Sequence, residues 1–175
     1  SYVPQAFTKA YTRAWKKMAP DAEGKIAPQF LVIEEINRGN CAQVFGDLFQ
    51  LLDRDGTNYS KYAIEADSDL AKHIAGEFAD APADIPDSIR DGTMLRLPPN
   101  LYIWATMNTS DQSLFPMDSA FKRRWDWEYI PIRDAGKDWK IEAAGETFGW
   151  WEFISTINKF IFDTLKSEDK QLGYF

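Results

Sequence analysis

The stretch Phe30–Arg38 constrains the fold more than any other part of the chain, because an apolar run passes directly into two acids. Four apolar residues, Phe30–Ile33, precede Glu34 and Glu35. A short continuous apolar run with β-branched members is typical of a strand buried on both faces, as in a parallel sheet covered by helices. Ligands of open α/β sheets bind at the carboxyl ends of the strands. The sequence therefore predicts a buried strand that ends in a functional acidic pair.

The acidic pair allows three interpretations. In a two-carboxylate hydrolase both acids flank one bond, but adjacent strand residues point to opposite faces, which disfavours this arrangement for Glu34 and Glu35. In a Walker B element one acid serves the Mg²⁺ shell and the next polarises the attacking water. In the third interpretation the acids are solvated side chains at a strand end. The stretch alone leaves the second and third interpretations open.

Length and composition indicate a globular domain. The chain has 175 residues, of which 45% are hydrophobic and 15% aromatic, so it can form a core. The net charge of −7 argues against binding of this chain alone to the phosphate backbone of a nucleic acid. A single cysteine excludes an internal disulfide and fits a reducing cytoplasm. No segment resembles a signal peptide or a membrane span, so we expect a cytoplasmic protein without membrane contact.

Hydrophobic periodicity predicts an α/β order of elements. Helices are expected at Tyr2–Met18, Asn40–Leu52, Ser68–Phe78, Pro116–Arg124 and Trp151–Leu165, the last with Ile154, Ile157, Ile161 and Leu165 facing inward. Parallel strands are expected at Phe30–Ile33, Leu101–Met107 and Trp125–Ile130. Two short antiparallel pairings are also expected, Tyr59–Glu65 with Thr93–Leu97 and a hairpin around Gly145.

Three kinds of polar group follow the predicted strands or the helix beyond them. The acids Glu34 and Glu35 follow the first strand, Asn108 follows the second, and Arg123 and Arg124 end the next helix. Taken singly, an arginine pair is most often a solvated helix end and an asparagine a turn residue. Together they supply an acid for metal and water, an amide to orient water, and a cation for phosphate charge. Their order therefore indicates phosphoryl transfer.

Three motifs extend this interpretation into a family resemblance. The stretches Ile33–Asn40, Met107–Ser113 and Asp118–Trp125 resemble the McrB branch of AAA+ NTPases. That branch contains the GTP-driven motor subunit of modification-dependent restriction systems. The resemblance runs from about Phe30 to Phe175. It implies an α/β fold that is a partial AAA+ P-loop NTPase core. Such a core has a parallel sheet flanked by helices, a β-hairpin insertion before sensor 1, and the start of a helical lid.

The resemblance also implies roles for the polar residues around the nucleotide. Glu34 corresponds to the first Walker B acid, which acts on Mg²⁺ through water, although Asp is commoner there. Glu35 corresponds to the catalytic glutamate that polarises water. Asn108 corresponds to sensor 1, and Asp111 belongs to the same nucleotide-binding motif. The segment Asn37-Arg38 belongs to the signature and suggests work at a subunit interface.

The two arginines resemble the arginine finger pair, which acts on nucleotide held by a neighbouring subunit. Side chains of consecutive helical residues diverge by about 100°, so Arg123 and Arg124 can hardly reach the same oxygen. We expect Arg124 to be the finger and Arg123 to brace the subunit interface or the sensor.

The chain departs from the family in lacking a phosphate-binding loop before its acidic strand. The pair Gly24-Lys25 does not complete a P-loop, because Ala19 and Ile26 stand where glycine and serine or threonine are required. The sequence is therefore expected to be an internal piece of a longer protein and to be inactive alone. Residues 1–133 are assigned to the partial AAA+ core, and residues 134–175 to the start of the lid.

The resemblance implies a function for the whole protein. That function is GTP or ATP hydrolysis with Mg²⁺ in a hexameric ring, together with a McrC-like nuclease subunit and with DNA bound through other domains. A MoxR-like AAA+ chaperone and a non-catalytic scaffold with the same fold are the alternatives.

Overall fold

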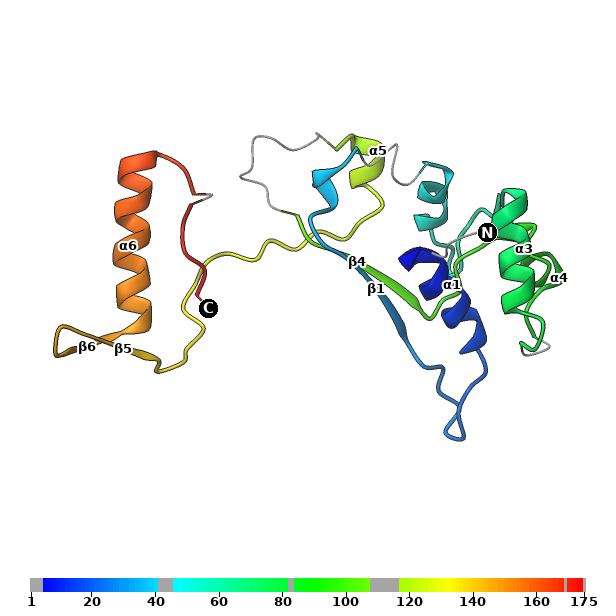
Figure 1. Ribbon diagram of the computed structural model, residues 1–175, viewed down its shortest axis with the longest axis horizontal. Coiled ribbons are helices and arrows are strands. Elements are labelled where there is room, and N and C mark those ends of the chain that lie inside the picture. Colours follow the sequence, from blue (N-terminus) through cyan, green and yellow to red (C-terminus); the bar gives the residue numbers. More distant parts are fainter. Residues whose placement is uncertain (1–4, 41–45, 82–83, 108–116, 169, 175) are drawn as a thin grey trace. The chain divides into compact units, whose positions relative to one another are not determined.

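A computed structural model describes residues 5–40, 46–81, 84–107, 117–168 and 170–174. Contacts divide these residues into two compact units (Figure 1). The first unit comprises the described residues up to 107 together with 117–125, and the second begins at residue 126. None of the helices in these ranges is long and apolar enough to cross a membrane.

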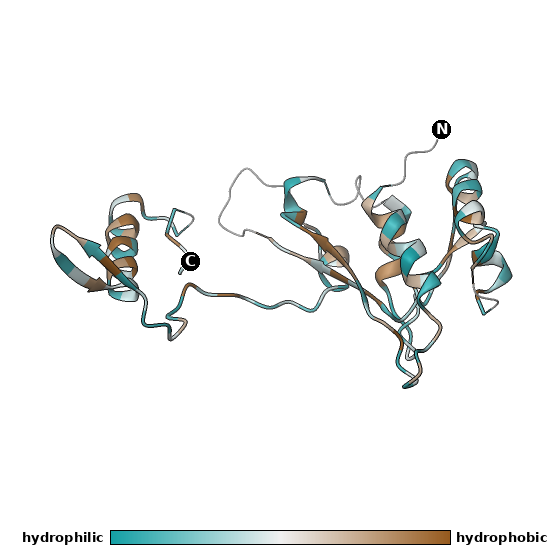
Figure 2. Cartoon of the chain, turned by 60° about the horizontal axis from the view of Figure 1, so that its bottom comes forward, coloured by the Kyte–Doolittle hydropathy of each residue, from teal (hydrophilic) through white to brown (hydrophobic). Residues whose placement is uncertain are grey.

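The first unit is built around two parallel strands that lie side by side (Figure 1). Strand β1 (Gln29–Ile33) pairs with β4 (Leu101–Ala105) in a register that runs from Gln29 opposite Leu101 to Ile33 opposite Ala105. In Figure 2 much of the paired strands is brown, the colour of hydrophobic residues. The parallel pairing of the acidic strand with the strand before Asn108 is confirmed, and the carboxyl ends of both strands meet at one edge.

Helix α1 (Ala6–Lys16) covers one face of this pair. Its apolar stripe, predicted from the sequence, is buried in the main core, where Tyr11 and Ala14 are fully buried and Trp15 is 2% exposed. Leu101 belongs to the same core, and Leu31 and Ile103 pack against it. Complete burial of one such large apolar side chain contributes roughly 1.5–3 kcal/mol. This helix therefore fixes one side of the strand pair.

The opposite face of the strand pair is open, so the expectation of a strand buried on both faces is wrong for the described residues. Phe30 is 43% exposed, Val32 56%, Tyr102 49% and Trp104 60%. The Phe30 ring lies 5.5 Å from the Tyr102 ring and 5.0 Å from the Trp104 ring, between centroids. Alternate strand residues point to opposite faces, and α1 covers only the face of Leu31 and Ile103. An apolar run predicts that a strand is buried, but it does not indicate which other element covers each face of the strand.

The third parallel strand, predicted at Trp125–Ile130, is absent, because residues 126–133 form neither helix nor strand. Trp127 is 51% exposed, Tyr129 74% and Ile130 83%. An alternating pattern favours extended backbone, but a strand also needs a neighbouring edge for its hydrogen bonds. The pairings in the described ranges are β1 with β4, β2 with β3, and β5 with β6. The described parallel sheet therefore has two strands.

The predicted pairing of Tyr59–Glu65 with Thr93–Leu97 is present in shortened form. Strands β2 (Ile64–Glu65) and β3 (Met94–Leu95) pair antiparallel. Between them lie α3 (Ser68–Glu77), close to its predicted bounds, and the short α4 (Asp87–Arg90). The side chain of Asp67 caps α3 by accepting two backbone N–H bonds of its first turn, which explains where the helix begins.

The helix expected at Asn40–Leu52 is only partly visible. Residues 41–45 lie outside the described ranges, and the described part is a 3₁₀ helix, η2 (Gly46–Leu52). Leu51 is fully buried in the main core, and Leu48 and Leu52 pack against that core. The described apolar residues of this segment therefore belong to the core, whereas the helix type differs from the expected α-helix.

The second unit contains the predicted hairpin and the long helix. Strands β5 (Lys140–Ala143) and β6 (Glu146–Gly149) pair antiparallel across Ala144 and Gly145, which have φ values of 54° and 82°. Two consecutive positive φ values are typical of the tight turns of hairpins. Helix α6 (Trp150–Leu165) follows directly, with Ile154 fully buried. Leu165 is 55% exposed, so its predicted inward orientation is wrong; it ends the helix with no described element packed over it.

The C-terminal segment is attached to α6 by one buried asparagine. Asn158, 7% exposed, accepts the Leu172 N–H at 2.6 Å and donates to the Leu172 carbonyl at 2.8 Å. Beyond it, the Trp150 indole donates to the Tyr174 carbonyl, and the Tyr174 hydroxyl donates to the Lys137 carbonyl at 2.8 Å. The terminal segment is thus part of the second unit's core.

Replacing this asparagine is expected to release the terminal segment. Asn158→Ala leaves both backbone groups of Leu172 without their side-chain partner, at a cost of about 1–3 kcal/mol. Hydrogen exchange at the Leu172 amide should accelerate accordingly. Lys159→Ala, at the next, exposed position of α6, serves as the control. Unchanged protection in Asn158→Ala would contradict the anchoring role.

Candidate functional site

The two predicted acids form a turn at the carboxyl end of β1. Both Glu34 and Glu35 are exposed, and the short helix η1 (Ile36–Arg38) begins immediately afterwards. Glu35 has φ 51° and ψ 52°, the left-handed region that residues other than glycine rarely adopt. Its carboxylate pairs with the Arg38 guanidinium at 2.8 Å. The acid to which the sequence assigns catalysis thus has a left-handed backbone conformation.

Thr106, one residue beyond β4, fastens this turn with three hydrogen bonds. Its N–H donates to the Ile33 carbonyl at 2.9 Å, and its carbonyl accepts the Ile36 N–H at 2.9 Å. Its hydroxyl oxygen accepts the Glu35 N–H at 3.1 Å. The end of β4 therefore determines the path of the acidic turn.

A second hydrophobic cluster joins this edge to helix α5 (Ser119–Lys122). Its buried members are Ile36, 7% exposed, and Phe121, 3% exposed. The residues packed against them are Ile33, Phe49, Ala105, Met107, Met117 and Trp125. The side chain of Asp118 caps α5 by accepting the Phe121 N–H at 2.6 Å. The acidic turn and the helix that the two arginines follow thus pack on one cluster. The predicted helix start at Pro116 lies outside the described residues.

The neighbouring arginines at the end of α5 differ in burial. The Arg124 side chain is only 9% exposed, and two of its nitrogens contact the Asp53 carboxylate at 2.9 Å and 3.1 Å. It also donates to the Ala120 carbonyl at 2.6 Å and lies 4.2 Å from the Phe49 ring centroid. Arg123 is exposed. Arg124 is therefore bound inside its own unit, while Arg123 faces solvent.

The predicted sensor residues cannot be placed beside these groups. Asn108 and Asp111 lie outside the described residues. Met107, the residue before Asn108, packs in the cluster of Ile36 and Phe121. The described part of this strand end therefore belongs to the same cluster as the residues that follow the acids.

The described acids could supply only part of the ligand shell of a magnesium ion, and they would do so through water. No group of three or more histidine, cysteine, aspartate or glutamate residues comes together in the described ranges. Mg²⁺ usually keeps several waters and is held by one or two carboxylates plus substrate phosphates, so it needs no such group. An exposed carboxylate at Glu34 offers the hard oxygen that this ion prefers. The donor set is thus compatible with Mg²⁺ bound together with a phosphate ligand.

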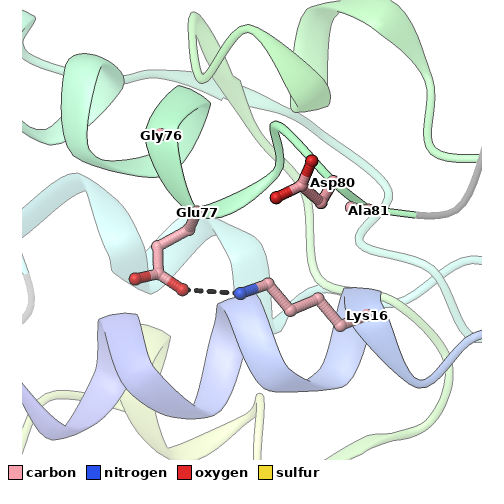
Figure 3. A pocket seen from close by; sticks show the side chains of 5 residues that line it. All are labelled: Lys16, Gly76, Glu77, Asp80 and Ala81. Atoms are coloured by element: carbon pink, nitrogen blue, oxygen red, sulfur yellow. Dashed lines mark hydrogen bonds and ion pairs between the residues drawn. The ribbon is translucent and has the colours of Figure 1, made fainter.

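A polar hollow elsewhere in the first unit does not share this chemistry. Lys16, Gly76, Glu77, Asp80 and Ala81 line a space of about 450 Å³ between α1 and the end of α3 (Figure 3). The Lys16 ammonium lies 2.6 Å from the Glu77 carboxylate. That hydrogen bond and the positive charge lower the pKa of Glu77. The two charged groups neutralise each other. None of the residues that line this hollow belongs to the edge that carries Glu34 and Glu35.

Two residues that shape the candidate site had no signal in the sequence. Thr106 lies inside a run predicted as strand, and Asp53 lies in a predicted turn. Both act through side chains that meet partners 71 residues away along the chain. Neither spacing nor residue type could indicate such contacts.

Sequence comparison places the chain among characterised proteins. The family described as AAA domain (dynein-related subfamily) matches residues 1–125. The chain is 41% identical over 152 residues to YdiS, a component of the type II restriction enzyme BsuMI of Bacillus subtilis strain 168. It is 31% identical over 98 residues to the EcoKMcrB subunit of the type IV methyl-directed restriction enzyme of Escherichia coli K12.

These alignments cover 83% and 55% of the chain, respectively. They cover only 41% of YdiS and 17% of the EcoKMcrB subunit. The chain therefore spans less than half the length of these relatives.

Proposed function

The chain belongs to the AAA domain family, dynein-related subfamily, and its relatives are McrB-type restriction components; from this we propose that the whole protein hydrolyses GTP or ATP to drive a restriction system. The observation that carries the proposal is the edge where Glu34 and Glu35 follow a parallel strand, with the helix that precedes the two arginines on the same hydrophobic cluster. Enzymes that transfer phosphoryl groups combine acids, an amide and a cation at such an edge.

The proposed reaction assigns separate tasks to the two acids and the sensor. Glu35 accepts a hydrogen bond from a water molecule and directs its oxygen at the terminal phosphorus. The water oxygen bonds to that phosphorus while the bond from phosphorus to the bridging oxygen breaks. A nucleoside diphosphate and inorganic phosphate are released, and one proton of the water passes by way of Glu35 to solvent. Glu34 would hold Mg²⁺ through a water molecule, and the ion would supply positive charge that offsets the charge of the phosphates. Asn108 orients the attacking water, and Asp111 supports the same motif.

The burial of the arginines supports a different division of labour from the one expected from sequence. Arg124 already has the Asp53 carboxylate, a backbone carbonyl and the Phe49 ring as partners. Releasing it toward a neighbouring subunit would leave a half-buried carboxylate unpaired. We therefore assign the finger role to the exposed Arg123 and the bracing role to Arg124. A finger acts in trans, so this assignment rests on a ring, for which we propose a hexamer.

The restriction role comes from the relatives, which are a component and a subunit of restriction enzymes. We propose that the whole protein works in the cytoplasm with a McrC-like nuclease subunit and contacts DNA through other domains. Residues 1–133 contribute part of the motor core, and residues 134–175 the start of its lid.

Two measurements on the whole protein test this function. Nucleotide turnover separates a motor from a non-catalytic scaffold. Co-purification with a nuclease separates a restriction motor from a MoxR-like chaperone. Absence of turnover with both GTP and ATP, in a folded ring that binds nucleotide, would overturn the motor assignment.

Residues 1–175 alone are expected to bind no nucleotide tightly. Their sequence has no P-loop, and therefore neither the cradle of backbone N–H groups nor the lysine that holds the phosphates. Calorimetry with GTP or ATP and Mg²⁺ should show no saturable heat. The whole protein under the same conditions is the positive control. Micromolar binding by residues 1–175 would place the phosphate site within this chain.

A further inference from the structure

The turn that carries Glu35 is held by a side chain that the reaction scheme does not use. Thr106 contributes its N–H to Ile33, its carbonyl to Ile36 and its hydroxyl oxygen to the Glu35 N–H. Any residue at position 106 could make the first two bonds, because they use backbone groups. Only serine or threonine can make the third in the same way. The hydroxyl therefore adds a contact that is specific to the acid.

The backbone of Glu35 is in a conformation that such a contact stabilises. At φ 51° and ψ 52° the residue occupies a region that costs free energy for a side chain with a Cβ atom. Strained backbone conformations persist when the surrounding structure over-determines them, and they cluster at functional sites. The Thr106 hydroxyl oxygen accepts a hydrogen bond from the N–H of Glu35, the strained residue itself.

The side chain of the same acid has a second partner, Arg38. The Glu35 carboxylate lies 2.8 Å from the guanidinium of Arg38, three residues later, and both side chains are more than half exposed. An exposed ion pair of this kind is weak and leaves the carboxylate mobile. The direction of the carboxylate therefore depends on how firmly the backbone beneath it is fixed.

We propose that Thr106 is a positioning residue for Glu35, whose hydroxyl holds the left-handed turn so that the carboxylate is presented to the attacking water. The inference rests on the proposed hydrolytic role of Glu35. It predicts that the hydroxyl matters for the chemical step and not for nucleotide binding. The Glu35 N–H lies at the surface, so water can replace the hydroxyl and the fold survives its loss.

The test uses the whole protein and a change that removes only the hydroxyl. Thr106→Val keeps the shape of the side chain, and we expect unchanged nucleotide affinity with kcat lowered roughly 10- to 100-fold, the range that a small misplacement costs. Thr106→Ser restores the acceptor and should recover most of the rate. Thr164→Val makes the same swap at an exposed helical threonine, whose hydroxyl bonds only within α6, and should leave kcat unchanged.

A double variant distinguishes positioning from a general structural effect. The double variant Glu35→Gln/Thr106→Val should have the same residual turnover as Glu35→Gln alone, because both changes act on the Glu35 carboxylate. An unchanged kcat in Thr106→Val, or full additivity with Glu35→Gln, overturns the inference. If Thr106→Val loses nucleotide affinity, Thr106→Ala is measured in its place, and the same loss there marks a structural residue. Full turnover in Glu35→Gln instead overturns the proposed role of the acid itself.

Discussion

Glu35→Gln in the whole protein is expected to keep nucleotide binding and to lose hydrolysis by about 10²–10⁴-fold. The amide has nearly the shape of the carboxylate but cannot polarise or deprotonate water as a carboxylate does. Its backbone N–H remains, so the bond to the Thr106 hydroxyl and the strained turn are retained. The measurements are a nucleotide Kd and a steady-state turnover number for the same preparation.

The control for this change is Glu65→Gln, which neutralises an exposed acid on β2, outside the candidate site. It should leave turnover unaltered. Loss of binding in Glu35→Gln would indicate a structural role for the turn. Unaltered turnover would place the catalytic acid elsewhere, and Glu34 would be the next candidate.

The sequence predicted those parts of the fold that depend on local pattern. Strands β1 and β4, the hairpin around Gly145 and helices α1, α3 and α6 all follow from periodicity and turn residues. Each of these elements has its apolar or turn signal within a few residues of chain. Local pattern was therefore sufficient for them.

The failures concern partners that lie far away or outside the described residues. The apolar run of β1 predicted burial on both faces, but α1 covers one face, and Phe30 and Val32 remain exposed on the other. The alternation after Trp125 predicted a strand, but no described edge pairs with it. Propensity indicates a conformation, whereas burial and pairing need a second element.

The candidate site was predicted as a set of residues but not as a geometry. The acids do lie at the carboxyl edge, and α5 is joined to that edge through Phe121. The left-handed backbone of Glu35 and the capture of Arg124 by Asp53 depend on contacts across 71 residues. Sequence spacing carries no information about either contact.

The arginine pair gives the second large effect and also tests the assembly. Arg123→Ala in the whole protein should abolish hydrolysis while leaving the subunit folded, because an exposed side chain is removed. Fingers supplied in trans are worth roughly 10³–10⁵ in turnover in well-studied NTPases. Arg124→Ala should instead lower the free energy of unfolding by about 1–3 kcal/mol, since Asp53 and the Ala120 carbonyl lose their partner. Turnover and urea unfolding measured on both variants separate the two roles.

Mixing two inactive variants shows whether Arg123 acts across a subunit boundary. In a mixed ring, an Arg123→Ala subunit keeps its own Glu35 and can receive the intact Arg123 of an adjacent Glu35→Gln subunit, so some turnover should return. Mixtures as inactive as either variant, in rings shown by mass to be mixed, would contradict action in trans. Recovery with Arg124→Ala in place of Arg123→Ala, together with unaltered stability, would return the finger role to Arg124. The contact between Arg124 and Asp53 would then be a resting arrangement that the ring replaces.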